Sequence, residues 1–325
     1  MLVNDGLVKK IPDYATGQSN ARAAAVQYAS SNQVGASLPS VDSNSSNSTS
    51  GDVVLGYMSD PSDPNCALDF SNPLLYNAVQ VRVRKNATKN GLVDAFFSRV
   101  WGNPGEPVAA RATSVMSSSV VGFKVTSETG NAHVLPFALK KSSWDALVGG
   151  SGADQYMYNS NGSVESGSDG ILELNMYPLE NGASGNFGTV DIGNPNNSTA
   201  DFSRQIRYGV DKNDLAFIGG ELKLGSDGTL VLNGDTGISA GIKDDMNAVK
   251  GKPSAICLYD TVSGNGNNAM YTIVGFAGVR IVNVKLTGNP KYVTIQPAGV
   301  IDASALIGNS PNQSKYLYSN VRLVR

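Results

Sequence analysis

The sequence predicts an α+β fold, in which a small unit of mixed helices and strands precedes a larger, mostly antiparallel β-rich domain with accessory helices. Three observations lead to this prediction. The 325 residues are enough for two domains with separate cores. The 36 glycines, together with abundant Asn, Ser and Asp, indicate frequent turns between short apolar runs. The densest apolar run, residues 269–286, is rich in the β-branched and aromatic residues that favour strands.

The first unit is predicted to span residues 20–119, after a flexible segment of residues 1–19. Asn20 is expected to cap an alanine-rich helix that ends near Asn32, because Asn is a favoured cap and Ala a strong helix former. Strands are predicted at residues 53–58, 77–84 and 108–116, a short helix at 94–101, and polar loops at 41–52 and 60–73.

The second domain is predicted to span residues 120–325. Its strands are expected at residues 134–139, 170–178, 253–259, 292–296 and 316–324, the last two closing the sheet. Its helices are expected at residues 142–148, 198–208, 211–217 and 242–249, with a serine cap on the first and either Ser198 or Thr199 as the cap of the second. A loop-rich hairpin is expected at 149–170, and a tight hairpin joins 221–224 to 229–232 across Asp227-Gly228.

The apolar run at residues 269–286 is predicted to form the centre of this domain. We expect two paired strands, 269–274 and 279–286, joined by a turn at Gly275 and Gly278. Arg280, Asn283 and Lys285 alternate with apolar residues, but the alternation slips by one residue after Ile281. Such a slip would move every later side chain to the other face, so a bulge is expected at residues 281–282.

Composition excludes several classes of function. The net charge of −2 argues against nucleic-acid binding, which requires a basic face. No apolar run is long enough to span a membrane, so the chain as written is expected to be soluble. Cys66 and Cys257 are expected to be two separate buried thiols, with one disulfide as the alternative in an oxidising compartment. Neither has the spacing of a zinc or redox pair, and no metal site is assigned.

Two short motifs match nucleotide and hydrolase signatures. Residues 264–269 fit the pattern G-x-G-x-x-A, but a strand follows where a dinucleotide site needs a helix, so this site is rejected. Residues 237–241 fit the nucleophile elbow around Ser239. The only histidine, His133, precedes Ser239, whereas the base of this motif follows its serine. A serine hydrolase therefore stays a distant alternative, because triads are defined by geometry rather than by chain order.

Other candidate residues have structural explanations. Asp235 begins an Asp-Thr-Gly triplet, but aspartic proteases need two such aspartates, so it is expected to cap the helix at 242–249. The groups Asp211/Asn213/Asp214 and Asp60/Asp63/Asp69 lack the EF-hand pattern and are expected to form solvated turns, with calcium binding as the alternative. Structural roles are expected for His133 (partly buried), Trp101 and Trp144 (core), and Arg82, Arg84, Arg99 and Arg111 (solvated face). No catalytic, cofactor-binding or metal residue is assigned.

Several segments together resemble one known family. Residues 21–30 (ARAAAVQYAS), 51–57 (GDVVLGY), 77–85 (NAVQVRVRK), 96–102 (FFSRVWG) and 107–115 (PVAARATSV) carry the likeness in the first unit. These segments are similar to the TadG-like branch of the Tad (tight-adherence, Flp-type) pilus-assembly proteins. Residues 134–139, 188–206, 233–241 and 266–288 resemble the long C-terminal part of one subgroup. The likeness covers nearly the whole chain from about residue 20, and its motifs concern packing and turns.

The resemblance implies a pseudopilin-related protein with a pilin-like first unit. Family members carry an N-terminal hydrophobic helix that anchors them in the inner membrane, while the rest lies outside the cytoplasm. The present sequence does not contain that helix, so membrane attachment is expected only through a segment absent from it. The implied partners are other pilus or envelope proteins and further copies of the chain, and the resemblance transfers no catalytic residue.

The expected function is therefore that of a non-enzymatic extracytoplasmic protein of pilus assembly or of the cell envelope. The alternative is a binding module that recognises glycans or surfaces through the Asn/Gly-rich loops at residues 149–170 and 264–268. A hydrolase built on Ser239 is the third and most distant hypothesis.

Overall fold

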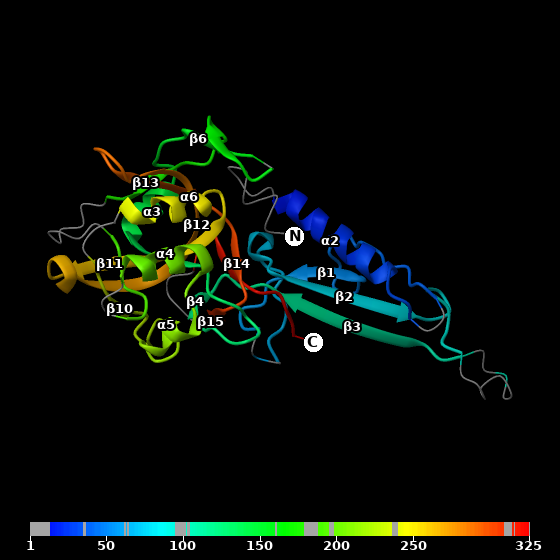
Figure 1. Ribbon diagram of the computed structural model, residues 1–325. Coiled ribbons are helices and arrows are strands. Elements are labelled where there is room, and N and C mark those ends of the chain that lie inside the picture. The colour runs from blue at the N-terminus through cyan, green and yellow to red at the C-terminus, as the bar shows by residue number, and fades with distance from the viewer. Residues whose placement is uncertain are drawn as a thin grey trace. The chain divides into compact units, whose positions relative to one another are not determined.

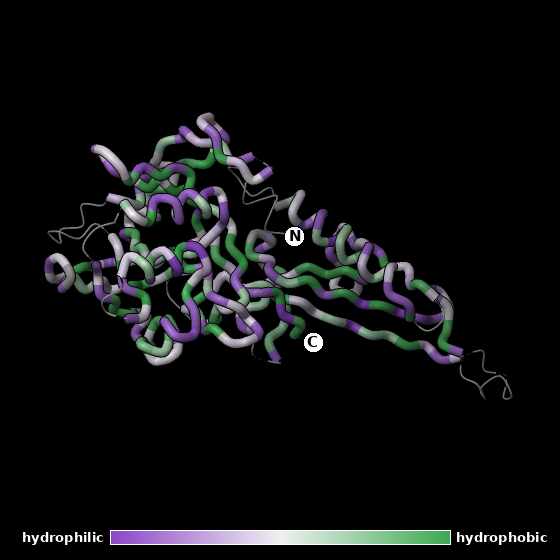
Figure 2. The backbone as a smooth tube through the Cα atoms, viewed as in Figure 1, coloured by the Kyte–Doolittle hydropathy of each residue, from purple (hydrophilic) through white to green (hydrophobic). Residues whose placement is uncertain are grey.

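The computed structural model (Figure 1) describes residues 14–34, 37–61, 63, 65–94, 102, 105–159, 161–178, 188–194, 198–235, 240–308, 314 and 316–324. Hydrophobic residues concentrate in its strands, and the connecting loops are mostly hydrophilic (Figure 2). The combination of a few helices with several mainly antiparallel sheets confirms the predicted α+β class.

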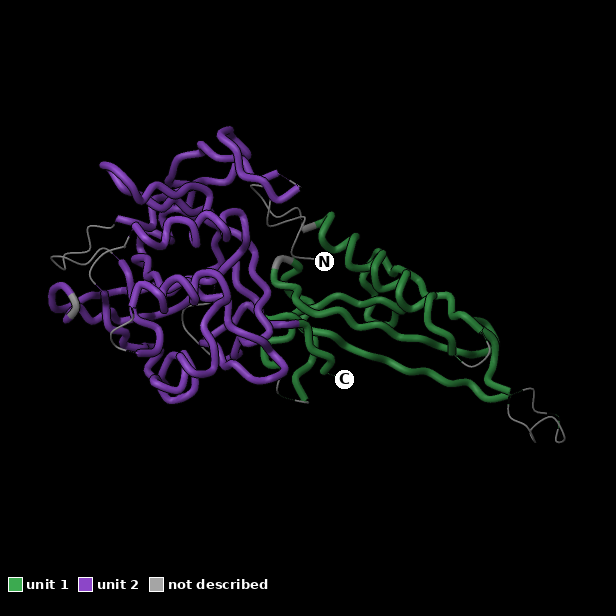
Figure 3. The backbone as a smooth tube through the Cα atoms, viewed as in Figure 1, with its two compact units in different colours: residues 1–6, 11–117, 321–325 green, residues 7–10, 118–320 purple. Residues whose placement is uncertain are grey.

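The chain divides into two compact units (Figure 3). Unit 1 contains the described residues up to Ser117 together with those from Val321 onward, and unit 2 extends over Ser118–Asn320. Within the described residues, the chain passes from unit 1 to unit 2 after Ser117 and returns to unit 1 at Val321.

Unit 1 is a four-stranded sheet with one long helix. Its strands follow the order β1 (Val53–Gly56), β2 (Ala78–Lys85), β3 (Val108–Val115) and β17 (Arg322–Leu323), and all neighbours are antiparallel. Helix α2 (Tyr14–Ser30) packs against β1 and β2. A 3-10 turn, η1 (Pro73–Leu75), precedes β2. The predicted strands of this unit are confirmed, whereas the helix predicted at 94–101 lies, apart from Asp94, outside the described residues.

Helix α2 begins six residues before the predicted cap, so the capping role of Asn20 is wrong. Contacts with the rest of unit 1 hold the helix in place. Arg22 is buried and donates hydrogen bonds of 3.0 Å to the carbonyls of Ser43 and Val53. Near the first turn, Gln18 donates to the carbonyl of Pro73. Tertiary hydrogen bonds of this kind are invisible to a capping rule that considers only neighbouring residues.

Unit 2 is built on a six-stranded mixed sheet. The order along it is β5 (Val134–Lys140), β11 (Pro253–Ser263), β12 (Met270–Lys285), β13 (Tyr292–Pro297) and β8 (Leu174–Tyr177), with β10 (Leu230–Asn233) also on β12. Within this sheet β5 and β11 are parallel, and the other neighbouring strands are antiparallel. Smaller sheets are formed by β15 (Ala305–Ile307), β4 (Val120–Phe123) and β9 (Leu222–Lys223), by β14 (Val300–Asp302) and β16 (Leu317–Ser319), and by β6 (Tyr156–Tyr158) and β7 (Val164–Ser166).

Alternate residues of the central strands enter two hydrophobic cores. Ile256 and Leu258 belong to one core, and Ala255 and Cys257 to the other, as the two-residue period of a strand requires. The first core receives side chains from α3 (Lys141–Val148), α4 (Thr199–Tyr208) and α6 (Lys243–Ala248), and the second from β4, β9 and α5 (Lys212–Ala216). Trp144 is buried in the first core, with its ring edge-to-face on Tyr316, which confirms its packing role.

The prediction of two paired strands within residues 269–286 is wrong, because β12 runs unbroken through both glycines. Glycine is needed at position 278 because two backbone carbonyl groups approach β12 closely there, and not because the chain turns. A Cβ atom there would lie 1.9 Å from the carbonyl oxygen of Tyr316 and 2.4 Å from that of Ala298. The predicted bulge is confirmed, since the register with β13 shifts between Ile281 and Asn283.

Two further strand predictions are wrong. Strands β9 and β10 flank the predicted Asp-Gly turn, where Gly228 has the expected positive φ of 78°, but each pairs elsewhere, β9 with β4 and β10 with β12. The segment 316–324 does not close the main sheet. Its first part, β16, pairs with β14, and its second part, β17, joins β3 of unit 1.

The predicted cap is correct only for α4, and the cap of α5 is not among the predictions. Ser198 caps α4 and Asp211 caps α5, each with a reciprocal acidic residue at the third helical position. Helix α3 starts after Lys140, and α6 follows Ile242 after a 3-10 turn, η3 (Ala240–Ile242), and neither has a side-chain cap. The expected serine cap of α3 and the expected capping role of Asp235 are therefore wrong.

Candidate functional site

The hydrolase candidate cannot be assembled from the described residues, because Ser239 lies outside them. His133 is described, and the expectation that it is partly buried is wrong, since 66% of its side chain is exposed. Its backbone N–H donates to the buried Asp302 carboxylate at 2.9 Å, and its Nδ1 lies 3.6 Å from the same oxygen. Ser304 donates to the other oxygen of Asp302.

His133 is predicted to titrate above its ordinary range. The hydrogen bond to Asp302 raises the pKa of His133, and this outweighs burial, which lowers it. Because the pKa is higher in the folded chain, the pair stabilises the fold below about pH 6.5 and loses this effect as pH rises through the folded pKa. Exposure limits the effect to a few tenths of a kcal/mol. An NMR titration of this single histidine, with the urea-unfolded chain as reference, should give the higher pKa in the folded chain; equal values would contradict the pairing.

The two groups of acidic residues serve as turn and cap residues. Asp211 caps α5, and its carboxylate and that of Asp214 both accept hydrogen bonds from Arg204. Asp63 and Asp69 each accept from the backbone N–H two residues further on. Among the described residues, no group of three or more His, Cys, Asp or Glu side chains is placed to hold a metal ion. The two cysteines are free, Cys257 buried and Cys66 half-buried.

A polar surface forms where one face of β12, β13 and β8 meets the β6–β7 hairpin. The register of these strands sets the same-face cross-strand neighbours as Arg280 with Gln296, Asn283 with Thr294, and Lys285 with Tyr292. The bulge after Ile281 keeps Asn283 on the face of Arg280. Asn175 of β8 pairs with Thr294, whose hydroxyl donates to the Asn175 amide oxygen at 2.9 Å. Tyr156 of β6 accepts a hydrogen bond from Asn283.

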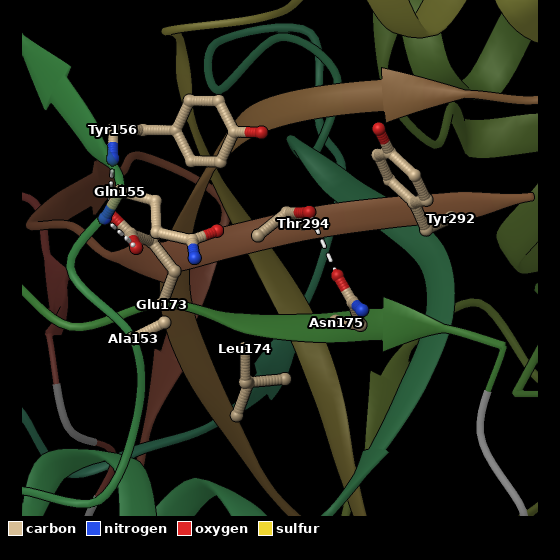
Figure 4. Close-up of a pocket in the computed structure, with 8 residues that line it drawn as sticks. All are labelled: Ala153, Gln155, Tyr156, Glu173, Leu174, Asn175, Tyr292 and Thr294. Carbon is tan, nitrogen blue, oxygen red and sulfur yellow. Dashed lines mark hydrogen bonds between the residues drawn. The ribbon is translucent and has the colours of Figure 1, made fainter. Parts of the chain in front are cut away.

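An open pocket of about 310 Å³ lies on this polar surface. Its lining comes from β8, β13 and the segment that leads into β6, and comprises Ala153, Gln155, Tyr156, Glu173, Leu174, Asn175, Tyr292 and Thr294. Figure 4 shows Thr294 between the rings of Tyr156 and Tyr292, with Asn175 and the amide of Gln155 beside it. The pocket thus combines two aromatic rings with amide and hydroxyl groups. Such a lining suits a small ligand that carries several hydroxyl or amide groups.

Glu173 gives the pocket a buried carboxyl group. Only 3% of Glu173 is exposed, and burial raises its pKa. Hydrogen bonds from the backbone N–H groups of Gln155 and Tyr156, at 2.8 and 3.0 Å, act in the opposite direction, and the nearby Asp154 and Asp169 add to the rise. The carboxylate therefore fixes the strand that carries Tyr156 to the sheet, and both of its oxygens are already engaged.

Arg280 and Gln296 continue the polar surface next to the pocket. Gln296 is two residues beyond Thr294 on β13, about 7 Å along the strand. Gln296 is fully buried and Arg280 is 6% exposed. The Arg280 guanidinium lies 3.3 Å from the ring centroid of Tyr158, while its Nε and both polar side-chain atoms of Gln296 have no hydrogen-bond partner among the described residues. Buried polar atoms of this kind are normally bonded, frequently to ordered water.

Unit 1 is similar in sequence to one known protein family. Residues 9–114 match the family described as "Putative Tad-like Flp pilus-assembly". The first third of the chain is Tad-like. This Tad-like region holds α2 and β1 to β3, and the match confirms the resemblance of the first unit to Tad pilus-assembly proteins. No curated protein and no solved structure matches the chain.

The sequence indicates one of the segments that line the pocket, but not the strands that complete it. The segment 149–170 was predicted as a hairpin region able to bind ligands, and it supplies Ala153, Gln155 and Tyr156. The second predicted binding loop, at 264–268, forms the turn between β11 and β12 with η4 (Gly266–Asn268) and does not contribute to the lining. The alternation of Arg280, Asn283 and Lys285 marks the polar face. Nothing in the sequence indicates that Asn175 and Glu173 lie beside it, because that depends on strand order.

Proposed function

We propose that the protein is a non-enzymatic, extracytoplasmic component of Tad/Flp pilus assembly or of the cell envelope. The observation that carries the proposal is the family match over residues 9–114, which spans the helix and three of the four strands of unit 1. Because the matched family is described as pilus-assembly proteins, we expect this protein to bind other pilus proteins. None of the helices in the described part of the chain has the length and apolar character needed to cross a membrane.

The proposed absence of catalysis is supported by the roles of the reactive side chains. The single histidine is exposed and contacts the buried Asp302, while Asp211 and Asp214 cap α5 and pair with Arg204. The buried Cys257 has its pKa raised by burial to about 12, so its thiol is not a ready nucleophile.

Deletion of the gene in its host tests the proposal. Cells without the gene are expected to lose surface pili or to show far fewer by electron microscopy, and the intact gene should restore them. A Ser239→Ala variant should restore pili equally well, since no hydrolysis is required. Cell fractionation should recover the protein in the envelope or outside the cell. Unchanged pili in the deletion strain, or recovery from the cytoplasm alone, would contradict the proposal.

A second candidate function is recognition of a hydroxyl-rich ligand such as a glycan. The pocket supports this hypothesis, because Thr294, Asn175 and Gln155 offer hydrogen bonds beside the rings of Tyr156 and Tyr292. We predict that the protein retains specific glycans on an array and that Thr294→Val weakens binding about fivefold, the effect of one lost hydrogen bond. Thr229→Val, which alters a surface turn residue bonded to Asp227, is the matched control. Equal loss in both variants, or no glycan bound, would exclude this function.

A further inference from the structure

The two margins of the unit 1 sheet, one formed by β1 and the other by β3 with the short strand β17, differ in how they are covered. The outer edge of β1 is covered by side-chain amides. Asn47 accepts from the N–H of Leu55 and donates to its carbonyl, both at 2.9 Å, and Asn44 donates to the carbonyl of Val53 at 2.8 Å. These bonds replace the partner strand that the edge lacks, which is one way natural sheets prevent unwanted pairing.

The outer edge of β3 is covered only at one end. Strand β17 pairs with Ser114 and Val115, and the N–H of Val324 donates to the carbonyl of Thr113 at 2.9 Å. Beyond that point, residues 108–112 are all exposed, and no described residue pairs with their outer side. In Figure 1, β3 forms the margin of the sheet along this stretch, with β2 on one side only.

The hydrogen-bonding pattern identifies which backbone groups face outward. Since the carbonyl of Thr113 points toward Val324, the N–H and C=O groups of Arg111 and Ala109 also point away from β2. Those of residues 108, 110 and 112 point toward β2 and are used in the sheet. Two residues therefore present four unused backbone groups in the geometry that a further strand requires.

The side chains at this edge carry unneutralised positive charge. Arg111 lies directly opposite Arg82 of β2, in the type of pair that brings side chains closest. Arg82 donates to the carbonyl of Ser50, and among the described residues no carboxylate lies within 4.0 Å of either guanidinium. Arg84, two residues along β2, differs because it is paired with the buried Asp52. Like charges opposite each other destabilise a sheet unless an anion is added.

We propose that the β3 edge at residues 108–112 binds an extended segment of another chain, which adds as a strand and places an acidic side chain opposite Arg111. Pairing of two copies of β3 is disfavoured, because it would bring the Arg82 and Arg111 pairs of both copies together on one face. The partner would be a second pilus or envelope protein. Only this identity of the partner rests on the proposed role in pilus assembly.

Binding of labelled peptides to the full chain tests the proposal. The probes are a short fluorescent peptide of alternating Thr and Val with one central Glu, and its counterpart with a central Lys. Fluorescence anisotropy should show the Glu peptide binding on the order of tenfold more tightly than the Lys peptide, and Arg111→Glu should reverse this preference. Hydrogen exchange should show new protection at the amides of Ala109 and Arg111, with that of Ala110 unchanged.

Ala109→Pro provides the decisive variant. Proline removes one outward N–H and is tolerated at a sheet edge, so the bonds to β2 are retained while binding of the Glu peptide is lost. Ala109→Ser, which keeps the N–H, should bind normally, and circular dichroism should show both variants folded. Equal binding of both peptides, or full binding by Ala109→Pro, would overturn the proposal. These results do not depend on the gene-deletion experiment, so the β3 edge and the pilus role can fail separately.

Discussion

Replacement of Gly278 by alanine is expected to lower the free energy of unfolding of unit 2 by about 3 kcal/mol or more. The new Cβ would lie 1.9 Å from the carbonyl oxygen of Tyr316 and 2.4 Å from that of Ala298, far inside van der Waals contact. Both obstacles are backbone atoms, so no side-chain rotation relieves the clash. The N–H of Ala298 also donates to the carbonyl of Gly278 at 3.1 Å, and displacement of that chain would break this bond.

Hydrogen exchange of the amides of β11 and β12 measures this loss within unit 2, and urea unfolding of the whole chain supports it. Gly288→Ala is the matched control, because a Cβ there meets no atom within 4 Å and only the positive φ of 76° opposes the substitution. We expect the control to cost about 1 kcal/mol. Equal stability of the two variants would show that the chain near Tyr316 does not approach β12 as described.

Replacement of Asp52 by asparagine is expected to destabilise unit 1 by about 2–4 kcal/mol. Asp52 is 1% exposed, and its carboxylate accepts from the N–H of Asp42 at 2.9 Å and from the side chains of Arg84 and Lys89. Asparagine keeps the shape but leaves two cations without their counter-ion. Arg84 and Lys89 remain partly exposed, so water limits the cost to the lower part of the range for a broken buried pair.

The same carboxylate makes the stability of unit 1 depend on pH in the acidic range. Burial tends to raise the pKa of Asp52, but the hydrogen bonds from Asp42, Lys89 and Arg84 outweigh it and hold the pKa below its usual value. A carboxyl whose pKa is lower in the folded chain stabilises the fold above about pH 4 and loses that effect as pH falls through the folded pKa. Hydrogen exchange in β1 and β2 between pH 7 and pH 3 should show this loss in the natural chain.

The loss should be weaker in Asp52→Asn, because the titrating group has been removed. Asp69→Asn serves as the control, since Asp69 is an exposed residue whose carboxylate accepts hydrogen bonds from the backbone N–H and the hydroxyl of Ser71. If Asp52→Asn and Asp69→Asn unfold alike across this range, the buried ion pair does not stabilise unit 1.

The sequence alone determined those elements whose causes are local. The cap at Ser198 specifies where α4 begins, because the bonds of its capping box join residues three positions apart. The slip in apolar alternation after Ile281 predicted the bulge, since the period of a strand fixes which face each side chain occupies. The packing and turn segments of the first third also indicated that this part is similar to Tad pilus-assembly proteins, which the family match over residues 9–114 confirms.

Only the tertiary structure decided what depends on partners distant in the chain. Gly275 and Gly278 were predicted to turn, yet Gly278 lies inside a strand because two carbonyls from later segments approach it. Strand β17 joins unit 1, and Asn175 lies beside Thr294, through pairings that no local pattern encodes. The pocket of unit 2 and the open edge of β3 follow from strand order. The period of hydrophobic residues predicts which side chains face the core. It does not predict which strands are neighbours in a sheet, because an apolar strand could pair with any of several others.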